Sequence, residues 1–573
     1  MIFYDFEVFK EDWLVVLADT TTLENFTIVN NRDELVKFYE SHKNDIYVGF
    51  NNKHYDQYIF KGIIAGFNPK EVNDWIIRDG KDGWMFSDVF RKIPMINYDV
   101  MQGLDRGLKF FEGSMGEMIK ESDVSFNLDR KLTDSEIEDT ITYCMHDVIN
   151  TMSVFQLRES DFTAQMGLLE MFGLPLSDVS KTKVQLSAKI LEAKKRDYND
   201  EFDISIPTNL RIKKYKEVVE WYEDPENRKY IKEDGKKNKL EINIAGVPHV
   251  FGWGGVHGAL EKYNCEGYFI NMDVASLYPS LMIEYNLHSR SCKSQKFNDI
   301  VETRLKYKAE KNPLQAPLKI VINGTYGAMK DKYNPLYDPR QANNVCVHGQ
   351  LFLLDLMEHL EPHGEIIQSN TDGILIRMPD GENPDEWFSK IDDVAYEWET
   401  RTRLKLEFDE YIKVVQKDVN NYVIIDADGK YKSKGAYVKK LSPLDYDLPI
   451  VNKAVVDYIV KDVPVETTIM TCAEPKEFQQ IKKISYKYDY LVHQGEILNE
   501  RCVRVFASLN EEGTLYKKHS SKDTWDKVEG TPTNCFVYNE NMCKEGFPIS
   551  KLDKHWYIEE AKNRLRGFGY EFV

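Results

Sequence analysis

Short apolar runs alternate with amphipathic helical stretches along the first third of the chain. Residues 2–9, 13–19 and 46–50 are rich in β-branched, aromatic and leucine side chains, which favours strands. Residues 136–155 instead carry apolar side chains at helical spacing. This alternation predicts an α/β domain that extends to about residue 175.

The pattern changes after that domain. Residues 176–250 contain a long polar helical pattern, followed at 211–239 by a stretch rich in Lys, Arg and Glu. Such a charge run is more typical of a solvated helical face than of a binding surface. Strong strands and glycine punctuation resume at FGWGGVHG, residues 251–258. Neither an internal repeat nor an extended low-complexity tract interrupts the sequence.

Composition narrows the class of protein. A length of 573 residues predicts about three to five domains or subdomains, and a hydrophobic content of 42% predicts a folded protein. The eight cysteines include no CxxC pair, which argues against a disulfide framework or a thiolate zinc site and favours a reducing cytoplasm. The first residues lack the regions of a signal peptide, and no apolar run reaches membrane-spanning length. A net charge of −19 argues against general attraction to nucleic acid but is compatible with a local basic groove.

Carboxylates recur near predicted strand ends in the first domain. Asp5 and Glu7 lie two apart on an apolar strand, so both point to one face and repel each other. A divalent cation is the economical positive partner for such a pair. Asp56 follows a second strand, and Tyr143 and Asp147 lie at i and i+4 on one helix. Each of these acids alone would be typical of a solvated residue.

This ordered set, Asp5, Glu7, Asp56 and Asp147 with Tyr143, resembles the DEDDy 3′–5′ exonucleases, including the proofreading domains of family B DNA polymerases. The resemblance implies that the four carboxylates hold two divalent metals about 4 Å apart, and that the tyrosine positions the attacking water. Family members also carry a DNA-contacting Asn before the second-motif Asp. Asn51 and Asn52 both fit that place. Lys120 matches an assisting lysine of small phage members, although a surface lysine is the more common case.

A second pair of acids is more widely separated. Asp273 ends an apolar run in YFINMDVASLYPSLMI, and Asp372 lies in a turn between two apolar strands in IIQSNTDGILI. DVASLYPS resembles motif A of family B DNA polymerases, although Asp273 could instead cap a helix. SNTDGI resembles motif C. The resemblance implies that the two acids hold two Mg²⁺ ions, with Mn²⁺ able to substitute, and that Tyr278 packs under the sugar of the incoming nucleotide. Asn370 stands where the family usually has Asp, which leaves a thinner set of carboxylates.

A polar stripe follows motif A. Lys319, Asn323 and Tyr326 recur at i, i+4 and i+7, so they share one face of a helix. The spacing K-x3-N-x2-Y-G resembles motif B of the same family. By that likeness Lys319 binds the triphosphate, Asn323 steadies the same region, and Tyr326 faces the nascent base pair. Arg304, on the preceding charged helix, is a further candidate triphosphate ligand.

Weaker signals predict DNA contacts. Gly254 and Gly255 resemble the YxGG linker between the exonuclease and polymerase parts of phage enzymes, where glycines let the backbone approach a phosphate. Tyr422 falls where the family has its KxY motif, whereas Lys417 is too far upstream for the usual spacing. Lysines interleaved with tyrosines over residues 430–440 predict a surface that follows duplex phosphates.

Six motifs in family order span residues 1–440, so the chain resembles a small, phage-type family B DNA polymerase with proofreading. The resemblance implies an α/β and α+β multidomain fold, with a ribonuclease H-like exonuclease domain and a right-hand polymerase. The implied divisions are an exonuclease domain (1–175), a linker or inserted segment (176–250), palm (251–300), fingers (301–345), palm (346–445) and thumb (446–573). The implied partners of this monomer are primer–template DNA, deoxynucleoside triphosphates and replisome proteins in the host cytoplasm, with two metal ions in each active site.

Beside the polymerase, two alternatives remain open on the sequence. The insertions of protein-primed phage relatives are missing around motif B, so priming by a terminal protein is not expected. Asn370 keeps open a DEDDy exonuclease whose polymerase half is only a DNA-binding scaffold. A non-catalytic protein that interacts with a replication machinery is the third hypothesis.

Overall fold

The computed structural model describes residues 1–572, which form two compact units. Unit 1 comprises Met1–Thr182, Leu441–Ile450 and Met470–Tyr557, and unit 2 comprises Lys183–Lys440, Val451–Ile469 and the chain from Ile558 onward. The carboxy-terminal region therefore contributes to both units. In this division the predicted segment 176–250 and the predicted thumb 446–573 are not separate bodies.

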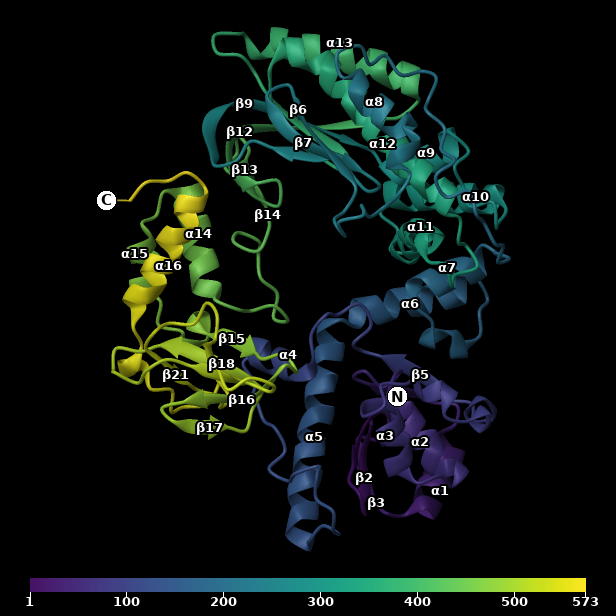
Figure 1. Cartoon of the computed structure of the whole chain (residues 1–573), viewed down its shortest axis with the longest axis vertical. Coiled ribbons are helices and arrows are strands. Elements are labelled where there is room, and N and C mark those ends of the chain that lie inside the picture. The colour runs from purple at the N-terminus through teal and green to yellow at the C-terminus, as the bar shows by residue number, and fades with distance from the viewer. Residues whose placement is uncertain (573) are drawn as a thin grey trace. The chain divides into compact units, whose positions relative to one another are not determined.

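A five-stranded sheet forms the centre of the amino-terminal part of unit 1 (Figure 1). Its strands run in the order β3-β2-β1-β4-β5. They are β1 (Ile2–Val8), β2 (Trp13–Asp19), β3 (Glu24–Val29), β4 (Ile46–Gly49) and β5 (Ile96–Asp99). β1 pairs antiparallel with β2 and parallel with β4. Both faces of β1 are buried, which explains its nearly continuous apolar run.

Helices cover both faces of this sheet. Phe3 of β1 packs edge-to-face on Phe155 of α5 (Asp134–Leu157), whereas Tyr4 and Phe6 pack on Phe60 of α2 (Asp56–Ala65). Alternate residues of β1 therefore meet α5 and α2 on opposite faces. The other helices here are α1 (Arg32–His42), α3 (Pro69–Ile77), α4 (Leu108–Met115) and α6 (Glu159–Met171), with 3-10 turns at Gly83–Met85, Asp88–Lys92 and Leu176–Ser180.

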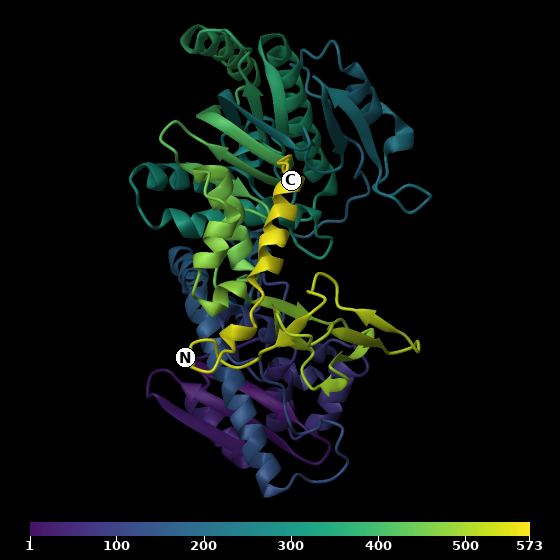
Figure 2. The same cartoon turned by 90° about the vertical axis from the view of Figure 1, so that its left-hand side faces the viewer.

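The rest of unit 1 is a β subdomain, residues 470–557, which we call the carboxy-terminal β subdomain. One sheet contains β15 (Gln480–Lys483), β18 (Cys502–Ala507) and β21 (Cys535–Val537), and the other contains β17 (Glu496–Leu498), β16 (Tyr488–His493), β19 (Tyr516–His519) and β20 (Trp525–Lys527). Strands β15 and β18 pack against α4, and Figures 1 and 2 both show these distant parts of the sequence side by side. Short 3-10 turns lie at Pro475–Phe478 and Ile549–Lys551.

Unit 2 is built on a nine-stranded antiparallel sheet in the order β14-β13-β12-β9-β11-β10-β8-β7-β6. The strands are β6 (Lys239–Ile244), β7 (Val247–Gly252), β8 (His257–Ala259), β9 (Tyr263–Val274), β10 (Glu365–Asn370), β11 (Gly373–Arg377), β12 (Leu406–Asp418), β13 (Asn421–Ile425) and β14 (Tyr431–Lys434). β9 lies between β11 and β12. No strand was predicted in residues 240–250, whereas β6 forms one edge of this sheet and β7 lies between β6 and β8.

Helices pack around this sheet. They are α7 (Lys183–Ile190), α8 (Lys216–Glu223), α9 (Leu277–Glu284), α10 (Ser294–Ala309), α11 (Gln315–Lys330), α12 (Pro339–Leu360) and α13 (Pro384–Thr402), with 3-10 turns at Pro225–Asn227 and Glu361–His363. Helices α14 (Pro449–Lys461), α15 (Val465–Thr471) and α16 (Lys554–Gly567) each begin in one unit and end in the other. None of the helices in residues 1–572 combines the length and apolar character needed to cross a bilayer.

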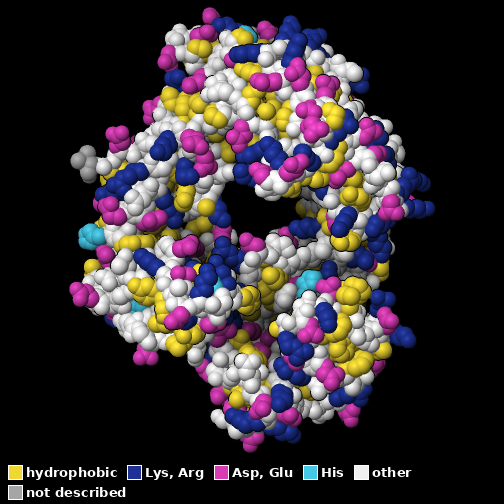
Figure 3. All heavy atoms as spheres, viewed as in Figure 1, with side chains coloured by type: hydrophobic (Ala, Val, Ile, Leu, Met, Phe, Trp, Pro, Cys, Tyr) yellow, Lys and Arg dark blue, Asp and Glu magenta, His cyan; other side chains and the backbone are white. Residues whose placement is uncertain are grey.

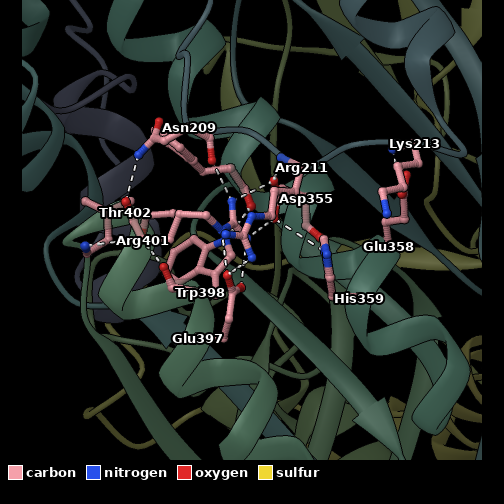
Figure 4. Close-up of polar contacts among 12 residues, drawn as sticks. Asn209, Arg211, Lys213, Asp355, Glu358, His359, Glu397, Trp398, Arg401 and Thr402 are labelled. Carbon is pink, nitrogen blue, oxygen red and sulfur yellow. Dashed lines mark hydrogen bonds and ion pairs between the residues drawn. The ribbon is translucent and has the colours of Figure 1, made fainter.

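Residues 209–213, which precede β6, form hydrogen bonds with α12 and α13 (Figure 4). Arg401 of α13 donates to Asp355 of α12 at 2.7 Å and to the carbonyl oxygen of Asn209 at 2.7 Å. The backbone N–H of Arg211 also donates to Asp355, and that of Lys213 donates to Glu358. Asp355 is fully buried, so its paired charge is an internal contact of unit 2 and not a solvated one. The role of this part of residues 176–250 is therefore structural.

Candidate functional site

Asp273 and Asp372 lie at the same end of the sheet of unit 2. Asp273 is the penultimate residue of β9 and pairs in register with Gly373 of β11 and Glu407 of β12. Asp372 occupies the turn between β10 and β11, and its carbonyl oxygen accepts a hydrogen bond of 2.7 Å from the N–H of Val274. A Cβ atom on Gly373 would lie 1.9 Å from Oδ1 of Asp273, so a side chain there would displace the Asp273 carboxylate.

A cavity of about 720 Å³ opens over these two acids. Asn271 donates to Oδ2 of Asp273 at 2.8 Å, and Lys432 is paired with Asp409 at 2.8 Å. The cavity lining includes Asn271, Asp273, Gln368, Asn370, Asp372, Glu407, Tyr422, Lys432 and Lys434. It therefore combines an acidic centre with cations contributed by β14.

The two acids carry more negative charge than the cavity compensates. Burial and, next, the neighbouring charge of Asp372 together raise the pKa of Asp273 to about 6. Burial also raises the pKa of Asp372, and Lys434 opposes this shift. A divalent cation would reverse both shifts, because it stabilises the ionised carboxylates. Carboxylate and amide oxygens are also the ligands that suit Mg²⁺ and Mn²⁺, so the donor set fits such an ion.

A second cavity, of about 290 Å³, adjoins the first and shares Ser276 and Asp372 with it. The rings of Tyr278 of α9 and Tyr326 of α11 lie 4.4 Å apart there. The lining comprises Ser276, Leu277, Tyr278, Pro279, Met282, Arg304, Ile322, Asn323, Tyr326, Thr371 and Asp372. Four of the predicted nucleotide-binding residues thus surround one cavity.

Arg304 and Lys319 differ in their position relative to this second cavity. The Nε atom of Arg304 is buried and has no hydrogen-bond partner within residues 1–572, so it can donate to a ligand. Lys319 is exposed on α11, one turn before Asn323, and does not line the cavity. It could reach only a ligand that extends beyond the cavity lining.

Two histidines support the turn that carries Asp372. His249 donates from Nδ1 to the carbonyl oxygen of Val247 at 2.8 Å, so its Nε2 accepts from the hydroxyl of Ser369 at 2.7 Å. Burial lowers the pKa of His249 to about 4, which keeps this ring neutral. His257 contacts the hydroxyl of Thr371 in the same way at 3.2 Å. Sequence reasoning missed both histidines, although His257 lies within GWGGVHG.

The acids predicted in the first domain come together in unit 1. Asp5 and Glu7 lie on the face of β1 that meets α5, and Cys144 of α5 donates to the backbone oxygen of Asp5 at 3.3 Å. Ligand atoms of Asp5, Glu7 and Cys144 all lie within 4.8 Å of one another. Asp56 begins α2, and its Oδ1 accepts from the N–H of Phe6 at 3.2 Å.

Lys109 of α4 reaches the same group, and sequence reasoning missed it. Its Nζ lies 2.5 Å from Asp147, 3.1 Å from Glu112 and 4.6 Å from the centre of the Tyr143 ring. Ligand atoms of Glu112, His146 and Asp147 lie within 4.8 Å of one another. The spacing of Lys109 and Glu112 at i and i+3 was the available signal. Lys120, the lysine considered from sequence, instead pairs with Asp123 at 4.0 Å.

Most of these acids have raised pKa values, because one lysine cannot compensate them all. Burial raises the pKa of Asp56 to about 7 and that of Glu112 to about 8. Burial and the neighbouring acids also raise the pKa values of Asp5 and Glu7. Asp147 differs, because Lys109 overcomes the effect of burial and lowers its pKa. We call Asp5, Glu7, Asp56, Glu112 and Asp147 the carboxylate cluster, and its oxygen-rich composition fits divalent cations.

Raised pKa values in the carboxylate cluster predict an unusual pH dependence of stability. Without divalent cations, the folded protein holds protons on Asp56 and Glu112 that the unfolded chain releases near pH 4. The contribution of these two acids to stability should therefore be greatest below about pH 4 and be lost as the pH rises to about 8. Thermal unfolding in a chelator from pH 5 to 8 should show a decrease of several degrees.

Mg²⁺ should reverse that decrease, because it binds the folded state. Asp56→Asn should flatten the pH slope in chelator. A melting temperature that is constant or rises over this pH range in chelator would contradict the prediction.

Among known proteins, three archaeal ones named DNA polymerase 1 are similar to the chain in sequence. The protein of Saccharolobus solfataricus is 21% identical over 321 residues, which cover 52% of this chain and 34% of that protein. Those of Sulfurisphaera ohwakuensis and Sulfolobus acidocaldarius are 25% and 23% identical over 308 and 280 residues, covering 49% and 45% of this chain and 32% and 30% of each relative.

The chain is similar to archaeal DNA polymerases. It spans about a third of the length of these relatives. No family model matches it. A solved structure of the family B DNA polymerase from the hyperthermophilic archaeon Pyrobaculum calidifontis aligns with a TM-score of 0.42 at 13% identity, over 100% of this chain and 78% of that one.

The two asparagines left open by the sequence differ in exposure. Asn52 is fully buried, and its amide donates to Asn97 at 3.0 Å and to the carbonyl oxygen of Tyr98 at 3.2 Å. The amide of Asn52 is therefore already satisfied inside unit 1, and its role in binding DNA stays a prediction. Asn51 is exposed, and its N–H donates to Asp99 at 2.9 Å.

The remaining predicted DNA contacts divide into two groups. Tyr422 lines the larger cavity, whereas Lys417 is paired with Asp418 at 2.6 Å and is not part of the lining. Lys432 and Lys434 line the cavity beside the acids, whereas the DNA-binding role of Lys417 stays a prediction.

The two glycines also differ. A Cβ atom on Gly254 would meet no described atom within 4 Å, whereas one on Gly255 would lie 2.8 Å from Thr371. Gly255 therefore permits close packing against the turn that carries Asp372.

Proposed function

We propose that this chain is a template-directed DNA polymerase that extends a primer 3′-hydroxyl with deoxynucleoside triphosphates. The observation that carries the proposal is the position of Asp372, which lines both cavities of unit 2. The acid pair thus adjoins a cavity with two tyrosines, an amide and a guanidinium, which together can bind a sugar, a base and phosphates. The similarity to proteins named DNA polymerase 1 supports this activity.

In this proposal Asp273 and Asp372 hold two Mg²⁺ ions, with Mn²⁺ able to substitute. The bound ions supply Lewis-acid chemistry, which lowers the pKa of the 3′-hydroxyl and neutralises charge on the phosphates. Arg304 donates to the triphosphate, and Tyr278 packs against the sugar and excludes a 2′-hydroxyl. Lys319 binds the far end of the triphosphate.

The remaining side chains around the two cavities hold the base pair and the duplex. From α11, Asn323 steadies the triphosphate region and Tyr326 faces the nascent base pair. Lys432 and Lys434 contact the phosphates of the duplex, because they line the cavity beside the acids.

We also propose that unit 1 is a 3′–5′ exonuclease that trims the primer. Asp5, Glu7, Asp56 and Asp147 would hold the divalent ions there, and Tyr143 would orient the attacking water. The support is that ligand atoms of Asp5 and Glu7 lie within 4.8 Å of each other, and that the charges of Asp56 and Asp147 raise the pKa values of both. Unit 1 would then contain the exonuclease domain, the sheet of unit 2 the palm, and α10 and α11 the fingers. The proposal also includes the expectations that the enzyme is of the phage type, is a monomer and acts on primer–template DNA.

A second candidate function is favoured by Asn370. It lines the larger cavity where the resembling family usually has a carboxylate. The alternative is an exonuclease whose unit 2 only binds DNA. Extension of a primed template by the wild type, in Mg²⁺ with all four deoxynucleotides, separates the two: trimming without any extension would support the alternative.

Restoring the missing carboxylate should strengthen extension if Asn370 weakens it. We expect Asn370→Asp to lower the Mg²⁺ concentration for half-maximal extension by about threefold to tenfold, because a third anionic ligand raises metal affinity. Titration of Mg²⁺ in a primer-extension assay measures this shift. Asn383→Asp, at the exposed cap of α13, is the matched control. An unchanged titration curve would mean that the side chain at residue 370 does not contribute to metal binding.

A further inference from the structure

Arg504 of β18 is completely buried inside unit 1. A buried arginine requires partners for all five of its N–H donors. Its Nε donates to Gln479 at 3.1 Å, and its other nitrogens donate to four backbone carbonyl oxygens. These oxygens belong to Gly113 at 3.1 Å, Glu117 at 2.7 Å, Tyr538 at 3.2 Å and Glu540 at 2.8 Å. The guanidinium therefore joins the carboxy-terminal β subdomain to the end of α4.

Other donors of the same subdomain bind neighbouring carbonyls. Gln479 donates to Ser114 at 3.1 Å, Lys476 to Met115 at 2.5 Å, and the N–H of Met542 to Gly116 at 2.8 Å. The last carbonyls of a helix have no partner within the helix, and cations near them also stabilise the helix dipole. The subdomain thus supplies the carboxy-terminal cap of α4 from several hundred residues away in the sequence.

Helix α4 also carries Lys109 and Glu112, whose side chains belong to the carboxylate cluster or contact it. It contains only eight residues, and an isolated helix of that length is unstable in water. Its position must therefore come from its packing. Ile481 of β15 packs closely on Gly113, where a Cβ atom would lie 2.9 Å from its Cδ1, and Cys502 donates to the carbonyl oxygen of Lys109 at 3.6 Å.

We propose that the carboxy-terminal β subdomain is part of the trimming machinery, and that Arg504 is a positioning residue that places Lys109 and Glu112 in the carboxylate cluster. This inference rests on the proposed exonuclease activity of unit 1. It assigns residues 470–557 a role that the predicted thumb did not include. The subdomain would act on trimming through α4, without itself contacting the reacting phosphate.

The test compares two arginines of one subdomain in the full-length protein. Arg504→Gln should reduce kcat for trimming of a single-stranded oligonucleotide by about tenfold to a hundredfold, because a misplacement of about 1 Å costs that much. KM for the oligonucleotide and the rate of primer extension should change less than about twofold. Arg501→Gln is the matched control, since Arg501 also donates to backbone carbonyls, those of Asp489, Ser485 and Tyr488, but none in α4. It should trim normally.

Hydrogen exchange gives a readout that does not depend on activity. Amide protons of residues 108–119 should exchange at least about tenfold faster in Arg504→Gln than in Arg501→Gln, whereas those of α5 should not change. Ile481→Ala, a milder variant, should shift exchange and trimming in the same direction. If the wild type does not trim, the exonuclease proposal is wrong, and exchange still tests the contact. Normal trimming by Arg504→Gln, or normal exchange at α4 in that variant, would overturn the inference.

Discussion

Replacement of Asp372 by asparagine should reduce primer extension by at least about 10³-fold, which corresponds to about 4 kcal/mol of lost transition-state stabilisation. The substitution keeps the shape of the side chain and removes the charge of one of the two aspartates that line the cavity. Because burial raises the pKa of Asp372, its charge is unfavourable in the metal-free fold. The same variant should therefore melt at a higher temperature than the wild type in chelator at pH 8.

Single-turnover extension of a primed template in Mg²⁺ measures the first effect, and thermal unfolding in chelator measures the second. Asp380→Asn is the matched control, since Asp380 is exposed and is paired with Arg377 outside the cavity. Trimming by unit 1 should change less than about twofold. Extension within tenfold of the wild-type rate would mean that Asp273 acts with another acid, for which Glu407 of the adjacent strand is the available candidate.

Local sequence patterns predicted those parts of the fold in which the spacing of apolar residues matches the side chains that are buried. Asp5 and Glu7 were placed on one strand face because the side-chain period of a strand is two, and that face does meet α5. The helix that carries Tyr143 and Asp147 was equally regular, and its amino-terminal end has a capping box formed by Thr133 and Glu136.

The strands in residues 239–252 were missed because charge obscured a short alternation. Leu240, Ile242 and Ile244 do repeat with period two in β6. The strand lies at the edge of the sheet, however, and its intervening residues are exposed. A charged edge strand is common, because it protects the sheet from pairing with other chains.

The spacing of Lys417 from Tyr422 already left the role of this lysine in doubt, and the strand geometry shows why it lies outside the cavity. The pairing of β12 with β13 shifts register between Gln416 and Asp418. Such a bulge turns the side chains beyond it toward the other face of the sheet. The lysines beside the acids instead come from β14, which the chain reaches through a further hairpin. A pattern of residue types in one strand does not record that turn.

Lys109 illustrates the limit of sequence reasoning about a site. Its i, i+3 spacing from Glu112 does not by itself distinguish it from a surface lysine, because such pairs are common on helix surfaces, and only Lys120 matched a lysine of the resembling family. Its place beside Asp147 depends on α4, whose carboxy-terminal carbonyls are bound by residues 476–542. Contacts across such a separation leave no local periodicity. The acids of the cluster could be predicted, but their counter-charge could not.

Replacement of Asp5 by alanine should reduce 3′–5′ trimming by at least about 10³-fold, because it removes a carboxylate from the centre of the cluster. The difference should be clearest on a primer with a mismatched 3′ nucleotide. The wild type should remove the mismatch and then extend, whereas Asp5→Ala should retain the mismatch and extend it slowly. On a fully paired primer, the two proteins should extend at rates within about twofold, because the acids of unit 2 are unchanged.

Asp19→Ala is the control for general damage to the sheet, since Asp19 is a buried acid of β2 that accepts from the N–H of Thr21 and lies outside the cluster. Loss of trimming in both variants would indicate disruption of the fold and not of the site. Trimming that persists in Asp5→Ala with normal Mg²⁺ dependence would remove Asp5 from the proposed ligands. Loss of trimming in Asp5→Ala alone, with extension preserved, would show that the two acid groups serve separate reactions in one chain.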